Sequence, residues 1–89
     1  MTKLNIEFSS NAWAEYQDWK QNNKSMVKKI DKLVNNIIRH PFIGLGKPEP
    51  LTGNLQGYWS RRINSEHRFV YGVLSDRIKI VQVKYHYDK

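Results

Sequence analysis

The residue types best suited to chemistry lie far apart in this sequence. Glu49 stands in a loop between two prolines, whose fixed φ angles restrict the direction of its carboxylate. Arg68 falls in a segment with strand character, and His86 and Tyr87 lie at the end of the last such segment. A compact domain rarely needs a His-Tyr pair there for packing. A carboxylate, a guanidinium and an imidazole together form a set suited to phosphoryl chemistry.

Metal-free cleavage of RNA is the reaction that this set fits best. It needs a base for the 2′-hydroxyl proton, a cation for the charge on the phosphorane, and an acid for the departing 5′-oxygen. Glu49, Arg68 and His86 fit these roles in that order, while Tyr87 suits a hydrogen bond to the phosphate or stacking on a base. Four further cations are candidates for holding flanking phosphates of the RNA: Lys47, Arg61, Arg62 and Lys84.

Each of these residues also has a plainer interpretation. A glutamate between prolines is usually an ordinary loop carboxylate, and a histidine on a terminal strand is usually solvated. Arg68 has two acidic residues nearby as ion-pair candidates, and Arg61 and Arg62 would also suit a solvated strand edge that blunts aggregation. His67 is a rival for the catalytic imidazole, but it alternates onto the core side, so we expect a structural role.

The net charge fits a polyanionic partner such as nucleic acid. The 89 residues include 15 Lys and Arg against 8 Asp and Glu, which gives +7. Charge alone does not separate RNA, DNA, an acidic protein or a membrane surface. Cysteine is absent and three scattered histidines make no zinc site, so we expect no metal and no cofactor.

The length predicts a single domain over residues 1–89 with one core. No charged-then-apolar leader opens the chain, and no apolar stretch approaches the ~18 residues that a membrane span needs. We therefore expect a soluble cytoplasmic protein without membrane contact.

The start of the chain predicts a strand followed by a helix. Residues 3–8 alternate polar and apolar side chains, as in a half-buried strand. Residues 9–11 offer helix N-caps, and the helix that follows ends near residue 21. Its aromatic stripe is expected in the core: Trp13, Tyr16 and Trp19.

A second helix is the clearest element of the sequence. Ser25 can cap it, apolar residues recur at intervals of three and four, and His40-Pro41 stops it. Three prolines and four glycines make residues 41–57 a loop, with a short extended piece around 48–51.

Three strands follow, near residues 58–63, 67–74 and 77–86. Pairing Tyr71 with Val81 in the last hairpin gathers one continuous apolar face: Phe69, Tyr71, Val73, Val81, Val83 and Tyr85. The same pairing places three polar side chains on the other face, together with the apolar Ile78, Ile80, Val70 and Leu74: Arg68, Lys84 and His86. The order β-α-α-β-β-β predicts an α+β fold, with two N-terminal helices on one face of an antiparallel sheet and an open, cation-rich face opposite.

Several separated motifs resemble those of the YoeB toxins, the Txe/YoeB family of the RelE/ParE superfamily. They occur in the right order over almost the whole chain: Gly46-Lys47-Pro48-Glu49-Pro50-Leu51, Gly57-Tyr58-Trp59-Ser60-Arg61-Arg62-Ile63, Glu66-His67-Arg68, Val70-Tyr71 and Tyr85-His86-Tyr87. The resemblance implies the same RelE-like fold. It also places the family's catalytic glutamate on Glu49, its arginine on Arg68 and its His-Tyr pair on His86 and Tyr87.

The resemblance implies the toxin of a bacterial type II toxin-antitoxin system, which enters the ribosomal A site, cleaves mRNA and is neutralised by a YefM-like antitoxin. The sequence leaves a homodimer open. Two rival functions also stay open: a non-catalytic gyrase inhibitor of the ParE type and a passive basic nucleic-acid-binding module. Two features depart from the family pattern, since Lys84 replaces a frequent arginine and Asp88-Lys89 extend the His-Tyr ending.

Overall fold

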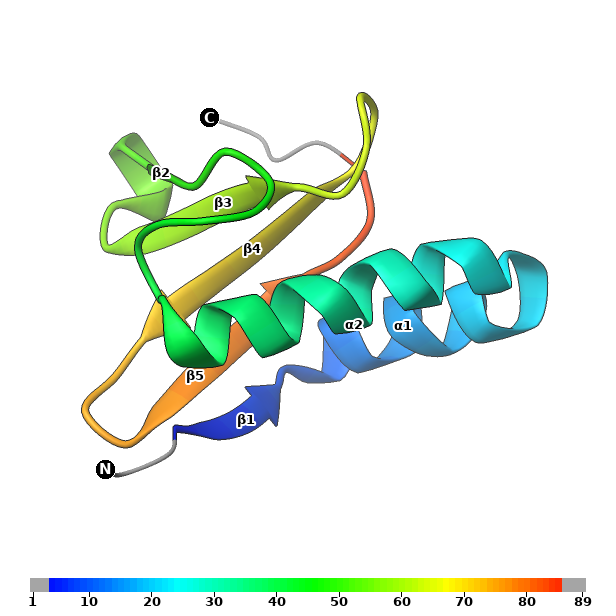
Figure 1. The fold of residues 1–89 in the computed structure, drawn as a ribbon, viewed down its shortest axis with the longest axis horizontal. Coiled ribbons are helices and arrows are strands. Elements are labelled where there is room, and N and C mark those ends of the chain that lie inside the picture. The colour runs from blue at the N-terminus through cyan, green and yellow to red at the C-terminus, as the bar shows by residue number, and fades with distance from the viewer. Residues whose placement is uncertain (1–3, 86–89) are drawn as a thin grey trace.

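Two helices lie side by side on one face of a five-stranded sheet (Figure 1). The computed structural model describes residues 4–85 of the chain. The elements run in the order β1 (Asn5–Phe8), α1 (Ser10–Asn22), α2 (Lys24–Arg39), β2 (Glu49–Pro50), a 3₁₀ turn (Gly53–Leu55), β3 (Tyr58–Arg62), β4 (Arg68–Val73) and β5 (Arg77–Gln82). The expected α+β fold is thus confirmed.

The helix boundaries follow from local capping. The Ser9 hydroxyl accepts a hydrogen bond from the Ala12 N–H at 3.1 Å, which satisfies one of the free donors at the start of α1. Only Asn23 separates α1 from α2. The expected cap at Ser25 is wrong, because α2 begins at Lys24 and Ser25 lies in its first turn, where its hydroxyl donates to Asn23 Oδ1 at 2.7 Å.

The core lies between the helices and the sheet. The helices contribute buried residues at helical spacing: Ala12, Trp19, Met26, Ile30, Leu33 and Ile37. The sheet and its flanks contribute the other buried members of the cluster: Ile63, Phe69, Tyr71, Ile78, Ile80 and Val83. Of the aromatic stripe on α1, only Trp19 is buried, while Tyr16 is half-buried and Trp13 is 49% exposed, so the expectation for Trp13 is wrong.

The sheet is mixed, with strand order β1-β5-β4-β3-β2. β1 runs parallel to β5, with Asn5 opposite Arg77, and the other neighbours are antiparallel. The purely antiparallel sheet expected from the sequence is corrected in this detail. Alternation of polar and apolar residues reports which face of a strand is buried, but it carries no information on strand direction.

The register of the β4–β5 hairpin differs from the expected one. Tyr71 pairs with Ile80 rather than with Val81, whereas Val70 pairs with Gln82. Val81 is therefore an extra residue in β5, which makes a β-bulge.

The bulge changes which side chains of β5 reach the core. Ile78 and Ile80 before the bulge and Val83 after it are 2%, 0% and 0% exposed. The expectation that Ile78 and Ile80 lie on the polar face is wrong, because one extra residue reverses the alternation partway along the strand. The expected strand over 77–86 also ends early, at Gln82.

No helix in residues 4–85 combines the length and apolar character that a membrane-spanning segment needs.

Candidate active site

The sheet register brings Glu49 and Arg68 to the face opposite the helices. Glu49 lies opposite Ser60, and Ser60 lies opposite Val70 in the next strand. Directly opposite residues project to the same face of a sheet, and so do residues two apart along one strand. Arg68 is two residues before Val70, so its side chain shares this face with Glu49. The sequence-based expectation placed Arg68 on this face, and the ladder adds Glu49 to it.

Glu49 is exposed and held by its neighbours in the chain. It belongs to β2, a two-residue strand within the expected extended piece, and it pairs with Ser60 of β3. Two backbone hydrogen bonds fix the segment on either side, from Arg62 N–H to the Gly46 carbonyl at 2.7 Å and from Leu51 N–H to the Tyr58 carbonyl at 2.9 Å. The backbone that carries the Glu49 carboxylate is thus fixed by hydrogen bonds on both sides.

Arg61 lies inside the protein with 0% exposure. Its five N–H groups reach five acceptors, and no carboxylate is among the acceptors given by the described residues: Tyr71 Oη at 3.1 Å, Asn36 Oδ1 at 2.5 Å, and the carbonyls of Leu45 at 3.0 Å, His40 at 2.5 Å and Ile43 at 2.9 Å. The interpretations of Arg61 as a phosphate ligand and as a solvated edge do not fit this position.

The buried guanidinium organises the loop that leads from α2 toward Glu49. The His40 carbonyl lies at the C-cap of α2, where the helix dipole favours a cation. The Tyr71 hydroxyl donates to the Pro41 carbonyl at 2.7 Å, and burial raises the pKa of that phenol. Asn36 also accepts from the Leu45 N–H at 3.1 Å. Helical periodicity puts Asn36 on the outer face of α2 and gives no signal for this role.

Arg68 is 8% exposed and anchored through one nitrogen. Its Nη1 donates to the carbonyls of Asn64 at 2.9 Å and His67 at 3.2 Å, with a longer contact to Ser65 at 3.4 Å. Among residues 4–85, Nε and Nη2 of Arg68 have no hydrogen-bond partner, and Arg68 makes no ion pair. The guanidinium is thus fixed in place with two nitrogens available to a ligand.

Lys84 does not share the face of Arg68, which corrects the expectation from the sequence. Its Nζ lies 2.5 Å from Asp18 Oδ2 on α1, and it lies over the rings of Trp19 and Tyr85 at 5.2 and 5.1 Å from their centroids. The Lys84 ammonium holds the pKa of the Asp18 carboxyl below its usual range, and Asp18 raises the pKa of Lys84. The bulge and the early end of β5 turn this residue toward the helices.

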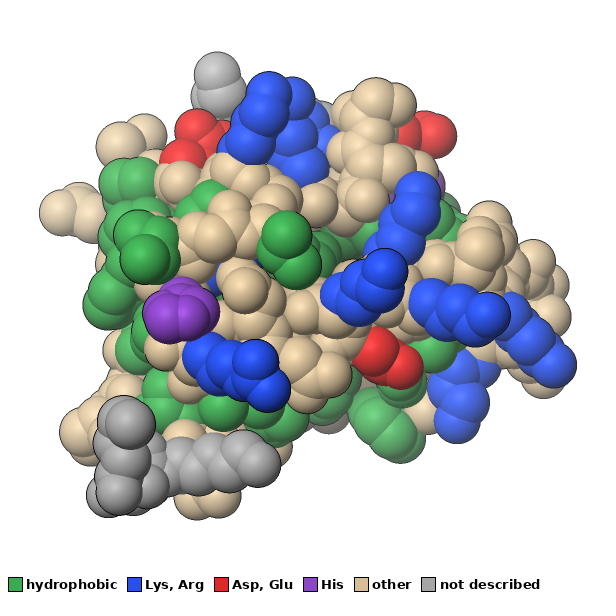
Figure 2. Space-filling model, in the orientation of Figure 1, with side chains coloured by type: hydrophobic (Ala, Val, Ile, Leu, Met, Phe, Trp, Pro, Cys, Tyr) green, Lys and Arg blue, Asp and Glu red, His purple; other side chains and the backbone are tan. Residues whose placement is uncertain are grey.

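Lys47 and Arg62 remain exposed beside the candidate site. Arg62 lies directly opposite Arg68 in the β3–β4 ladder, and Lys47 adopts a left-handed φ of 52° two residues before Glu49. Figure 2 shows that Lys and Arg side chains also spread widely over the face formed by α2. The net charge is therefore distributed, and it does not locate a ligand by itself.

His86 and Tyr87 lie outside the described residues. The last described residue, Tyr85, lies beside Arg68, because the Arg68 N–H donates to the Tyr85 carbonyl at 3.0 Å. The structural role expected for His67 is confirmed, since it is 8% exposed and its ring meets the Trp19 ring edge-on at 4.9 Å between centroids.

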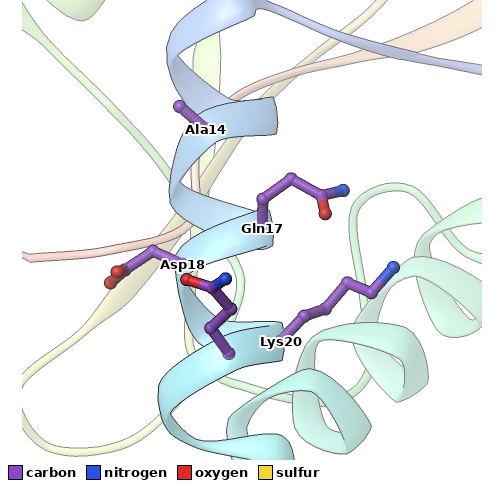
Figure 3. Close-up of a pocket in the computed structure, with 5 residues that line it drawn as sticks. Ala14, Gln17, Asp18 and Lys20 are labelled. Atoms are coloured by element: carbon purple, nitrogen blue, oxygen red, sulfur yellow. The ribbon is translucent and has the colours of Figure 1, made fainter.

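The described residues offer no metal site, and one surface hollow lies away from the candidate site. No group of three or more His, Cys, Asp or Glu within residues 4–85 is placed to hold a metal ion. An open hollow on α1 is lined by Ala14, Gln17, Asp18, Lys20 and Gln21, and Asp18 extends to the opposite side from Gln17 and Lys20 (Figure 3). This hollow contains none of the candidate catalytic residues.

Known proteins resemble this chain over nearly its full length. Residues 8–87 match the family described as "YoeB-like toxin of bacterial type II toxin-antitoxin system". Toxin YoeB of Streptomyces coelicolor is 48% identical over 84 residues, which cover 94% of this chain and 100% of the relative.

Solved structures from Staphylococcus aureus show the same similarity. A YoeB dimer is 53% identical with a TM-score of 0.90, and a YoeB-YefM complex is 54% identical with a TM-score of 0.88. Each match covers 97% of this chain and 100% of the other. Sequence and fold therefore agree on the same relatives.

Proposed function

This chain belongs to the YoeB-like toxins of bacterial type II toxin-antitoxin systems, and we propose that it is a ribosome-dependent endoribonuclease that cleaves mRNA in the A site. One observation carries the proposal, namely the ladder register that puts Glu49 and Arg68 on one face. Tyr85, the residue before the proposed acid His86, is hydrogen-bonded to the Arg68 backbone.

The reaction that suits these groups is attack of the 2′-oxygen on the adjacent phosphorus. Glu49 removes the 2′-hydroxyl proton as the O2′–P bond forms, and Arg68 stabilises the negative charge on the phosphorane. His86 gives a proton to the 5′-oxygen as the P–O5′ bond breaks. The products are a 2′,3′-cyclic phosphate, open to later hydrolysis to a 3′-phosphate, and a 5′-hydroxyl.

The dimensions of the sheet suit this scheme. Glu49 and Arg68 stand on strands two spacings apart, which is roughly 10 Å between strand axes. Side chains reaching inward from each strand leave space for a ribose-phosphate unit between them. Lys47 and Arg62 are the exposed cations that we propose for the flanking phosphates, and Tyr87 is the proposed orienting group. Arg61 and Lys84 are left out because their cationic groups are bound to other parts of the protein.

The proposed dependence on the ribosome rests on the need to align the RNA with the three candidate catalytic groups. Acid-base catalysis by positioned side chains requires that the reacting oxygens be aligned, and free RNA is flexible. We propose that the ribosome supplies this alignment and that the protein acts in the cytoplasm.

The proposed neutralising partner is an antitoxin of the YefM type. Solved structures from Staphylococcus aureus include a YoeB-YefM complex and a YoeB dimer. With a net charge of +7, this chain is suited to an acidic, partly disordered antitoxin segment that folds as it binds. Self-association as a homodimer is part of the same proposal.

Primer-extension mapping of an mRNA on programmed ribosomes tests the function. We expect wild-type cuts at the A-site codon that disappear in Glu49→Ala and His86→Ala and persist in Asp76→Ala, a matched loss of an exposed carboxylate in the β4–β5 turn. Ribosome binding should persist in all variants. Replacing the 2′-hydroxyl at the cut position with hydrogen should block cleavage.

Two results would contradict the proposal. Intact mRNA with every protein would favour a gyrase inhibitor or a passive binding module. Equal cleavage of the substrate without the 2′-hydroxyl would rule out the proposed nucleophile.

A further inference from the structure

The chain between the end of β5 and Tyr85 is held by side chains instead of by a sheet ladder. The Val83 N–H donates to Glu15 Oε1 at 2.8 Å, and the Val83 carbonyl accepts from Trp19 Nε1 at 2.9 Å. The Tyr85 N–H donates to His67 Nδ1 at 2.7 Å. Three backbone groups in this stretch thus bind specific side chains in place of a neighbouring strand.

Tyr85 is fixed on both sides. Its carbonyl accepts from the Arg68 N–H at 3.0 Å and from Gln82 Nε2 at 3.0 Å. Its φ is +64°, a left-handed conformation that is unfavourable for a residue with a side chain. Such a conformation persists where surrounding contacts hold the residue in place. On the N–H side of Tyr85, that contact is the hydrogen bond to the His67 side chain.

The hydrogen bond defines the state of the His67 ring. A backbone N–H can only donate, so Nδ1 must offer its lone pair, and the proton of the neutral ring resides on Nε2. Nε2 lies 3.8 Å from Glu66 Oε1, whose carboxylate favours an N–H on that side. A proton on Nδ1 would set two N–H groups against each other and break the contact.

We propose that His67, as the neutral Nε2–H tautomer, is a positioning residue that fixes Tyr85 and thereby the point from which the chain continues into His86. The inference rests on the proposed function, in which His86 is the proton donor. A proton donor acts only within hydrogen-bond reach of the leaving oxygen, so a displacement of about 1 Å at its root costs up to ~100-fold in rate. His67 itself touches no substrate.

The matched pair His67→Asn and His67→Leu isolates the hydrogen bond. Both side chains lack the ring and have the same number of heavy atoms, so both lose the Trp19 contact equally. Asn keeps an oxygen where Nδ1 stood, whereas Leu has a methyl group there. His40→Ala, at an exposed histidine on the α2 C-cap, controls for loss of an imidazole elsewhere.

Single-turnover cleavage on programmed ribosomes is the first measurement. We expect the cleavage rate of His67→Leu at saturating toxin to fall at least about tenfold below that of His67→Asn, with affinity for the ribosome unchanged within about twofold. His40→Ala should match the wild type. Equal rates for Asn and Leu, or a defect confined to ribosome affinity, would overturn the positioning role.

Two NMR measurements on the wild-type protein need no substitution. The ¹⁵N shifts of the His67 ring should show a protonated Nε2 and an unprotonated Nδ1, and the Tyr85 amide should exchange slowly with solvent. The Tyr85 amide should also lose its protection in His67→Leu and keep it in His67→Asn. The opposite tautomer, or a Tyr85 amide that exchanges freely in the wild type, would overturn the proposal even if both variants failed to fold.

Different results would contradict the proposed function and the proposed role of His67. If wild-type protein leaves mRNA intact, the proposed function fails, and protection of Tyr85 that depends on the acceptor still establishes the His67 anchor. If wild type cleaves and the Asn and Leu variants behave alike, the function stands and the anchor has no catalytic role.

Discussion

Arg62 lies directly opposite Arg68 in the β3–β4 ladder, so two guanidinium groups project from the same face of the sheet. Like charges directly opposite each other destabilise a sheet. Arg62 is exposed and Arg68 is 8% exposed, so the repulsion is only partly screened by water. Bound RNA would place phosphodiester charges beside both cations and offset their repulsion, so the pair would destabilise the free protein and favour the proposed complex.

The first prediction concerns Arg62. Arg62→Gln should raise the free energy of unfolding of the free protein by about 0.2–1 kcal/mol, because it removes the like-charge pair. It should also weaken binding to RNA of any sequence and lower the salt dependence of that binding by about one ion. Denaturant unfolding and a salt titration of RNA binding check the two halves.

Arg39→Gln is the matched control for Arg62, since Arg39 is an exposed cation in the last turn of α2. It should not raise stability. An Arg62→Gln protein that is less stable than wild type would contradict the account of the pair.

The second prediction concerns Arg61. Arg61→Lys should lower the free energy of unfolding by about 3 kcal/mol or more, because the three N–H donors of an ammonium cannot satisfy the five acceptors that the guanidinium binds. Urea denaturation measures this loss, and Arg62→Lys should change stability by less than about 0.5 kcal/mol. A fully stable Arg61→Lys with impaired RNA binding would restore Arg61 as a phosphate ligand.

The third prediction compares two glycines with positive φ. A Cβ at Gly46 would lie 2.9 Å from the Arg62 carbonyl, whereas a Cβ at Gly53 would meet nothing within 4 Å. The left-handed conformation should lower the unfolding free energy of both alanine variants by about 1 kcal/mol, and the steric contact should lower that of Gly46→Ala further. Thermal unfolding should therefore show a larger loss for Gly46→Ala.

The rate of RNA cleavage should also fall more in Gly46→Ala than in Gly53→Ala. Gly46 lies three residues before Glu49 and accepts from the Arg62 N–H, so its displacement moves the proposed base. Gly53→Ala should cleave like wild type once it is folded. Equal cleavage by both variants would mean that the turn before Glu49 tolerates displacement.

The fourth prediction concerns pH and the Asp18–Lys84 pair. The pKa of Asp18 is lowered in the folded protein, so its contribution to stability is present above its unfolded pKa near 4 and is lost as pH falls through the folded value. The pKa of Lys84 is raised, so its contribution is present below its unfolded pKa of about 10.4 and is lost as pH rises through the folded value. The pair therefore stabilises the protein between these limits.

Asp18→Asn checks this window. Its unfolding free energy should fall below that of wild type at pH 7, and the difference should vanish at about pH 2. Lys84→Met should cause a similar loss at pH 7, and adding it to Asp18→Asn should cost little more. A difference that persists unchanged in acid would show that packing, and not charge, links these residues.

The fifth prediction concerns the antitoxin. Affinity for an acidic antitoxin segment should fall steeply between about 50 and 500 mM salt, because the Debye length shrinks over this range. Titration calorimetry at several salt concentrations measures it. An affinity that stays flat would place the energy of the complex in apolar contacts.

Hydrophobic periodicity and the positions of proline and glycine were enough to predict α2, the loop and the order of strands in the last hairpins. They also predicted Arg68 on the face opposite the helices, which the β3–β4 ladder confirms. The pairing partner of β1 was not accessible, because contacts between residues 5–8 and 77–80 leave no local pattern.

Arg61 and Lys84 show why the expected positions of two candidate side chains differ from the observed ones. Alternation with Trp59 places Arg61 inward, but an arginine is rarely buried, so composition argues for the outside. Only the loop carbonyls and Asn36, brought together by folding, make the inside favourable. For Lys84, a single bulged residue upstream decided its direction, and bulges have no fixed sequence signature.

The position of β5 between β1 and β4 makes folding of this chain depend on one of the last segments to be synthesised. Among residues 4–85, β1 has no strand neighbour other than β5, and β5 supplies Ile78 and Ile80 to the core that α1 and α2 cover. A nascent chain that ends before residue 77 holds both helices and Glu49 but lacks the strand that joins β1 to the rest of the sheet. We therefore expect products cut short before residue 77 not to reach the native fold, and under the proposed mechanism activity would also need His86, which follows β5 in the sequence.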